Sequence, residues 1–230
     1  MSEHADVPAA LSRKCIPVDF YFDLICPWCM IGKRQLERAI ELVAIGYADV
    51  TVDVRWNSLP LLPDMPLEGK SYQAFYLDRL GSADAVKARR QQVRDAGLAS
   101  GIGFDFERIE WMPNTVAAHR LVEHAGQMGG ATLQSLLIDD LFQAYFIRGM
   151  NIGDLPVLAN IGETYDLPRA ATLAYMGSPV HDAPLERWQS EAQRERLSGV
   201  PGFVLGKRQT LSGALAPETL ARAMLASLPP

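Results

Sequence analysis

The sequence Cys26-Pro27-Trp28-Cys29 lies between a short apolar segment and a segment with helical periodicity. The largely apolar residues 18–22 predict a buried strand, and the residues from Pro27 onward predict a helix with one apolar side. A helix N-terminus carries a partial positive charge and unpaired N–H groups, which stabilise a thiolate, the nucleophile of disulfide exchange. The pair is therefore placed for redox chemistry, with Cys26 attacking first and Cys29 resolving the mixed disulfide.

Zinc binding and an inert cysteine pair are the alternative interpretations of this motif. A structural zinc site needs four ligands. The sequence offers one further cysteine, Cys15, and its four histidines show no ligand-pair spacing. Pro27 favours redox chemistry because proline suits the first position of a helix, where its missing N–H costs no hydrogen bond. We therefore expect no metal site, and we expect Cys15 to be a spare thiol, with a regulatory disulfide as the open alternative.

The bulk composition is that of a folded protein without a nucleic-acid or membrane partner. Of the 230 residues, 48% are hydrophobic and 21% charged, and the net charge is −5. A net negative charge disfavours binding to nucleic acid and to anionic membranes. No apolar run approaches the roughly 20 residues of a membrane helix. Residues 1–14 contain acidic residues and no continuous apolar run, so they do not resemble a signal peptide. We expect a cytoplasmic location, where cysteine pairs are more often catalytic than structural.

Strand and helix patterns divide the chain into two kinds of segment. Residues 1–16 are expected to be a tail, and residues 17–62 predict a β-α-β unit whose second strand begins at Val50. The strand pattern returns at 202–205 and 208–212, around a Gly206-Lys207 turn, and a last helix starts near Pro217. We therefore expect one discontinuous domain, built from residues 17–62 and 179–228, around one mixed sheet.

Helical periodicity fills most of the region between these strand segments. The candidate helices span residues 71–80, 84–99, 114–126, 131–147, 154–165 and 168–176. Glycines, including the pair Gly129-Gly130, separate them. Residues 63–178 are thus expected to form an inserted all-helical subdomain, which we expect to cover the cysteine pair.

This order of elements, with the cysteine pair at the first strand-to-helix junction, is similar to the DsbA family of the thioredoxin superfamily. It most closely resembles the FrnE-like branch, whose relatives include 2-hydroxychromene-2-carboxylate isomerases and kappa-class glutathione transferases. The matching segments, spread over residues 17–228, are Asp23 to Gly32, Pro113 to Thr115, Ala118 to Leu121, Leu141 to Phe146, Asn151 to Asp154, Gly199 to Val204 and Ser212 to Ala214.

The resemblance implies an α/β protein with a thioredoxin fold, a helical insertion and thiol-disulfide oxidoreductase activity. It also implies a cis peptide at Val200-Pro201 facing the cysteine pair. Because proline has no N–H, the backbone of Val200 would stay free to pair with an extended substrate, and Pro201 would shield the sulfurs from metals. Gly202 departs from the family pattern, in which a larger or polar residue is common.

Four more residues are candidates for the site. Asp23 is expected to relay a proton, to cap the helix or to hydrogen-bond within its loop. Trp28 is expected to cover the disulfide as an apolar lid, with a role as substrate anchor as the alternative. Asn114 and His119 are candidates for a substrate pocket, although Pro-Asn-Thr is also a good helix start and a helical histidine is usually structural. The run from Lys87 to Arg90 is expected to be a solvated helix face.

Three functions are compatible with these sequence features. The first is a thiol-disulfide oxidoreductase that acts on protein or low-molecular-weight disulfides, with no bound cofactor and with glutathione as a candidate redox partner. The second is a glutathione-dependent isomerase or transferase of the kappa-like class, whose members typically carry serine where this chain has Cys26. The third is a binding protein that senses redox state through Cys26 and Cys29. The cysteine at position 26 favours the first.

Overall fold

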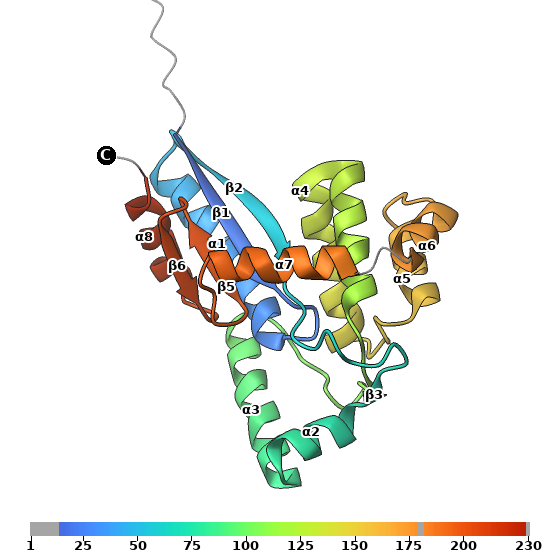
Figure 1. Ribbon diagram of the computed structural model, residues 1–230. Helices are drawn as coiled ribbons and strands as arrows, with labels where there is room; N and C mark the ends of the chain where they lie inside the picture. The colour runs from blue at the N-terminus through green and yellow to red at the C-terminus, as the bar shows by residue number, and fades with distance from the viewer. Residues whose placement is uncertain (1–13, 179–181, 229–230) are drawn as a thin grey trace, which may run out of the picture.

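The structure, a computed structural model, describes residues 14–178 and 182–228 (Figure 1). The sheet half contains β1 (Lys14–Phe22), α1 (Pro27–Gly46), β2 (Val50–Ser58), α7 (Asp182–Arg194), β5 (Gly202–Leu205), β6 (Gln209–Ser212) and α8 (Pro217–Ala226). Between β2 and α7 lie β3 (Lys70–Ser71), α2 (Tyr72–Leu80), α3 (Ala83–Ala99), β4 (Trp111–Met112), α4 (Val116–Phe146), α5 (Leu155–Glu163) and α6 (Arg169–Gly177).

Four strands form one mixed sheet in the order β2-β1-β5-β6. β1 runs parallel to β2, with Phe22 opposite Ser58 at the end of both strands, and antiparallel to β5. β5 and β6 form the antiparallel hairpin that the sequence predicts. The expected mixed sheet, interrupted in sequence by a helical insertion, is confirmed.

Alternate residues of β1 point to opposite faces of the sheet, as the period of a strand requires. Phe20 lies in the main core together with Leu36 of α1 and Leu220 of α8. Tyr21 points the other way and packs with Ala192 of α7. Helices α1 and α8 therefore cover one face, and α7 crosses the other (Figure 1).

The N-terminal boundary differs from the expected one. The predicted tail of residues 1–16 overlaps β1, which begins at Lys14 because Lys14, Cys15 and Ile16 pair with the start of β2. Cys15 is thus an exposed strand residue with a free thiol. Residues 1–13 of the predicted tail lie outside the described residues.

The insertion contains two groups of helices. In Figure 1, α2 and α3 form an arm below the sheet, whereas α4, α5 and α6 lie together beside β2. Unlike the expected all-helical subdomain, this region also includes the antiparallel pair β3-β4, whose two-residue strands are too short to show an alternating pattern. The predicted helices 114–126 and 131–147 are both present within α4, which reverses direction at Gly130 (φ 69°), a backbone conformation that favours glycine. The two helices lie side by side, since the Gln134 side chain donates to the Val122 carbonyl at 3.2 Å.

A buried lysine connects the sheet half to α4. Lys33 of α1 is almost fully buried, and its Nζ lies 2.6 Å from carboxylate oxygens of both Glu37 and Asp139. The ammonium also lies over the ring of Trp56, 5.1 Å from its centroid. Burial raises the pKa of Asp139, and the charge of Lys33 opposes that shift. Lys33 therefore holds α4 against α1 and β2 through charge pairing in a site with little solvent.

None of the helices within the described residues is both long enough and apolar enough to cross a membrane.

We expect Lys33→Met to lower the free energy of unfolding by about 2 kcal/mol, because it leaves two part-buried carboxylates without their cation. Urea unfolding measures this change. Arg34→Met is the matched control, since the exposed Arg34 is 3.4 Å from Glu37 and should cost less than about 0.5 kcal/mol. Adding Asp139→Leu to Lys33→Met should restore part of the loss. Equal losses from both single variants would contradict the role of Lys33.

Candidate active site

The cysteine pair lies where β1 passes into α1. Cys26 is the extended residue immediately before the helix (φ −94°, ψ 108°), and Pro27 is the first helical residue. The Cys29 N–H donates to the Cys26 carbonyl at 2.9 Å, so the first turn is closed around the motif. Cys26 is 6% exposed and Cys29 is fully buried. Cys26 is thus less exposed than a free helix end suggests, yet it is the more accessible of the two.

The environments of the two sulfurs differ. The Cys26 thiol donates a weak hydrogen bond to the Val200 carbonyl, with a sulfur-to-oxygen distance of 3.8 Å. Burial raises the pKa of the Cys29 thiol well above its usual range, and the hydrogen bond and charge of Cys26 raise it further. A backbone hydrogen bond at Asp23 lowers that pKa, whereas the negative charge of Asp23 raises it. Cys29 is therefore held as a neutral thiol, and it needs a proton acceptor before it can act as a nucleophile.

The loop before β5 lies against the motif. The Val200-Pro201 peptide is cis, as the family resemblance implies. Gly32 of α1 packs against Pro201, because a Cβ at Gly32 would lie 3.0 Å from the proline Cγ. The departure at Gly202 also has a local cause, since a Cβ there would lie 2.6 Å from a methyl group of Leu197. A larger residue after the proline would therefore require the Leu197 side chain to move.

Asp23 is the centre of a buried polar network behind the cysteines. Its carboxylate accepts a hydrogen bond from the Leu61 N–H at 2.7 Å and lies 3.1 Å from Nε2 of His119. Nδ1 of His119 lies 2.9 Å from the hydroxyl of Ser58. With a neutral imidazole, Nε2–H donates to Asp23 and the Ser58 hydroxyl donates to Nδ1. Asp23 and His119 are fully buried. Asp23 thus makes loop hydrogen bonds and also lies close enough to Cys29 to shift its pKa.

The expected pocket at Asn114 and His119 is not where the structure has its cavity. Asn114 is buried, donates to the Met65 carbonyl at 2.6 Å and accepts from the Val116 N–H at 2.9 Å. It therefore ties the loop after β2 to the start of α4. His119 is covered by Trp188 of α7, with ring centroids 5.8 Å apart. Neither side chain lines the cavity beside Cys26, because both point into the protein interior.

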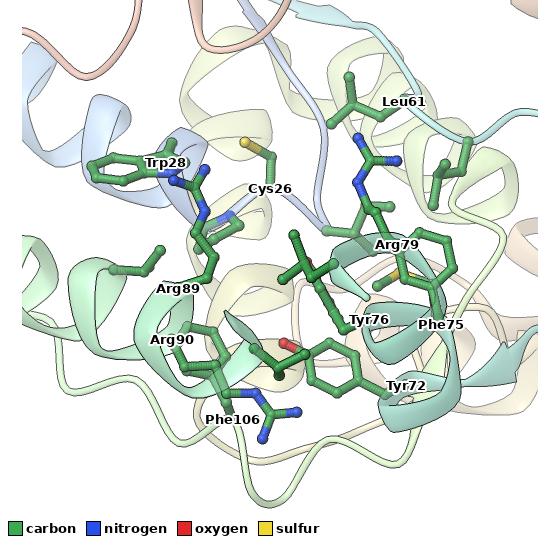
Figure 2. Close-up of a pocket in the computed structure, with 17 residues that line it drawn as sticks. Cys26, Trp28, Leu61, Tyr72, Phe75, Tyr76, Arg79, Arg89, Arg90 and Phe106 are labelled. Atoms are coloured by element: carbon green, nitrogen blue, oxygen red, sulfur yellow. The ribbon is translucent and has the colours of Figure 1, made fainter. Parts of the chain in front are cut away.

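A pocket of about 460 Å³ opens beside Cys26 (Figure 2). It lies between the start of α1, the loop after β2 and the α2–α3 arm. Of the insertion that was expected to cover the cysteines, α2 and α3 therefore face Cys26, whereas α4, α5 and α6 do not line this pocket. Trp28 forms part of the wall rather than a closed lid. Aromatic rings of Tyr72, Phe75 and Tyr76 line the pocket on the α2 side.

Two residues of the predicted solvated face belong to this pocket. Arg89 and Arg90 line it, and Arg79 joins them from α2, whereas Lys87 lies outside it. The sequence gives no sign of this grouping, because it depends on how α2 packs against α3. The position of Ser58 in the site could have been predicted from the sequence. Because β1 and β2 are parallel neighbours, the residues at their carboxyl ends meet at one edge of the sheet.

Tyr76 is another pocket residue that no sequence motif indicates. Figure 2 shows its side chain extending from α2 toward Cys26. Burial raises the pKa of Tyr76, and the negative charge of a Cys26 thiolate raises it further. The phenol therefore stays protonated and can donate a hydrogen bond. Within residues 14–178 and 182–228, no three His, Cys, Asp or Glu side chains are grouped so that they could hold a metal ion.

The DSBA-like thioredoxin domain family matches residues 17–225 of the chain. Among solved structures, the probable DsbA oxidoreductase SCO1869 from Streptomyces coelicolor is 22% identical with a TM-score of 0.82, covering 92% of this chain and 89% of that one. A 2-hydroxychromene-2-carboxylate isomerase is 17% identical with a TM-score of 0.67, covering 91% and 95%. The cytosolic disulfide reductase DsbM from Pseudomonas aeruginosa, solved with GSH, is 18% identical with a TM-score of 0.65, covering 92% and 98%.

We expect Asp23→Asn to lower the pKa of Cys29, because the substitution removes a negative charge that disfavours the Cys29 thiolate. Ultraviolet thiolate absorbance against pH measures this in a Cys15→Ser/Cys26→Ser background, where Cys29 is the only thiol. Asp19→Asn is the control, since it makes the same change of charge on β1. An equal shift of the Cys29 titration in both variants, or none in Asp23→Asn, would contradict a specific effect of Asp23.

Proposed function

The chain belongs to the DSBA-like thioredoxin domain family, and from that premise we propose that it is a thiol-disulfide oxidoreductase with Cys26 as nucleophile and Cys29 as resolving thiol. The observation that carries this proposal is the difference between the two sulfurs. Cys26 lines an open pocket, whereas Cys29 is fully buried and its pKa is raised. A substrate can therefore reach only Cys26, and Cys29 can react only with the sulfur of Cys26.

In the first step, the Cys26 thiolate attacks one sulfur of a substrate disulfide. A bond forms between Cys26 and that sulfur, the substrate S–S bond breaks, and the leaving thiolate takes up a proton. The N-terminus of α1 stabilises the attacking thiolate. Strand β5 begins at Gly202, so Val200 precedes the sheet ladder. This supports pairing of its backbone with an extended substrate.

In the second step, Cys29 loses its proton and attacks the sulfur of Cys26. The Cys26–Cys29 disulfide forms, the mixed disulfide breaks, and the second substrate thiolate leaves and is protonated, so the protein dithiol is oxidised and the substrate disulfide is reduced. Asp23 is the carboxylate whose charge acts on the pKa of Cys29, which makes it the candidate proton acceptor. Its carboxylate is positioned by the Leu61 N–H and by His119, which supports a role in relaying this proton.

The substrates and partners we propose are protein disulfides, low-molecular-weight disulfides and glutathione. The DsbM structure contains GSH and is described as cytosolic, which supports glutathione as a redox partner and a cytoplasmic location for this chain. We propose no resident cofactor. A glutathione-dependent isomerase is the second candidate, favoured by the likeness to the 2-hydroxychromene-2-carboxylate isomerase. A redox-sensing binding protein is the third.

Turnover assays separate these candidates. An oxidoreductase reduces a protein disulfide such as that of insulin in the presence of a thiol reductant, and its activity requires Cys26. A glutathione-dependent isomerase acts on an isomerisable substrate only with glutathione and does not consume disulfide. Absence of both activities in a protein whose cysteines cycle between dithiol and disulfide would favour redox sensing and would reject the proposal.

We expect Cys29→Ser to accumulate stable mixed disulfides with substrates, whereas Cys26→Ser accumulates none. Once Cys26 holds a partner, only Cys29 lies at the high effective concentration needed to displace it. Non-reducing gels of lysate detect the adducts. Both variants are made in a Cys15→Ser background, because Cys15 is an exposed free thiol. Equal trapping by the two variants would show that the nucleophile is assigned wrongly.

A further inference from the structure

The pocket beside Cys26 combines an apolar lining with positive charge. None of the 17 residues that line it is acidic, and three of them are arginines, Arg79, Arg89 and Arg90. This contrasts with the whole chain, whose net charge is −5. A volume of about 460 Å³ lies in the range of small-molecule sites. The pocket is thus suited to a small ligand with an apolar body and a negative charge.

The three arginines differ in how they are paired. Arg90 is held within the arm, since it lies 5.2 Å from the ring centroid of Tyr72 and 4.0 Å from a carboxylate oxygen of Glu107. Arg89 lies over the Trp28 ring at 5.7 Å and donates to Gln92. Within the described part of the chain, neither Arg79 nor Arg89 forms an ion pair. Two guanidinium groups thus stand at the pocket without a carboxylate.

Both arginines line the same pocket as Cys26. In Figure 2, the guanidinium groups of Arg79 and Arg89 end on either side of Cys26. A guanidinium fork binds carboxylates in a bidentate manner, and this pairing is stronger beside apolar walls than in bulk water. The aromatic side chains of Phe75 and Tyr76 offer ring faces and edges for a flat or branched apolar group.

We propose that this pocket selects low-molecular-weight disulfides that carry a carboxylate on an aromatic or apolar arm. The inference rests on the proposed oxidoreductase function and names the substrate class of that site. Arg79 and Arg89 bind the carboxylate while the arm packs against the α2 rings, which brings the disulfide to Cys26. Cys26 then attacks one sulfur and releases one carboxylate-bearing thiol. Cys29 releases the second, so two electrons pass from the protein dithiol to the ligand disulfide.

Single-turnover kinetics with two aromatic disulfides test this selection. Dithiobis(nitrobenzoate) carries a carboxylate on each ring, whereas dithiodipyridine is uncharged, and both release a coloured thiol. The reduced protein in a Cys15→Ser background is mixed with each reagent, and the ratio of the two second-order rate constants is the measured selectivity. A ratio cancels any general change in the reactivity of Cys26. Arg79→Gln/Arg89→Gln is the test variant, and Lys87→Gln, on α3 but outside the pocket, is the control.

We expect the double variant to lower the selectivity ratio about tenfold, which corresponds to about 1.4 kcal/mol for the two lost charge pairs. Lys87→Gln should leave the ratio nearly unchanged, and added salt should reduce it in the parent protein. An unchanged ratio in the double variant, or an equal slowing with both reagents, would overturn the selection while leaving the oxidoreductase function intact. If Cys26 reacts with neither reagent, the proposed function itself fails.

Discussion

The pairing of β1 with both β2 and β5 determines where the two cysteines and the cis peptide lie. β1 is interior in the sheet, and its core-facing residues Phe20 and Phe22 are fully buried. A strand held on both sides in this way directs the chain that follows it to one edge of the sheet. Cys26 therefore emerges at the start of α1, and the antiparallel β5 brings Val200 to the same edge from the opposite direction. Any change that displaced β1 would separate the thiols from Val200 and Pro201.

Helix α4 connects the environment of Cys29 to the insertion. It contributes His119, which bonds to Asp23, and Asp139, which pairs with Lys33 on α1. Both contacts join polar groups in places where solvent is scarce, so breaking either leaves an unpaired group that costs far more than an exposed pair would. Both helices of α4 are thus fixed, the first through His119 and the second through Asp139. Because Asp23 acts on the pKa of Cys29, the placement of α4 also influences that thiol.

Much of the framework follows from local patterns in the sequence. Periodicity identified the β1-α1-β2 unit and the final hairpin, and the glycine pair identified the break between the two helices of α4. Other features depend on contacts between distant segments, and no local pattern predicts these. The strand start at Lys14 requires pairing with Val50. The β3-β4 pair has too few residues to show a period.

The residues of the candidate site also include some that the sequence predicts and others that it does not. The motif and the family resemblance identified Cys26, Cys29 and Pro201 because their chemistry is tied to a short sequence. Arg89 looked like a solvated residue, since a helix with many charges usually faces water. Only the packing of α3 beside Trp28 brings it to the pocket. Arrangements of this kind are set by tertiary structure, so the place of the cysteine pair in the fold could be predicted from the sequence, whereas the lining of the pocket could not.

The thiols depend on backbone elements of the sheet half, whereas the arginines and aromatic rings are side chains on α2 and α3. A contact within the arm, Arg90 of α3 over the Tyr72 ring of α2, does not involve the thiols. Under the proposed function, substitutions in the arm are therefore expected to change which disulfide is bound without changing how it is reduced.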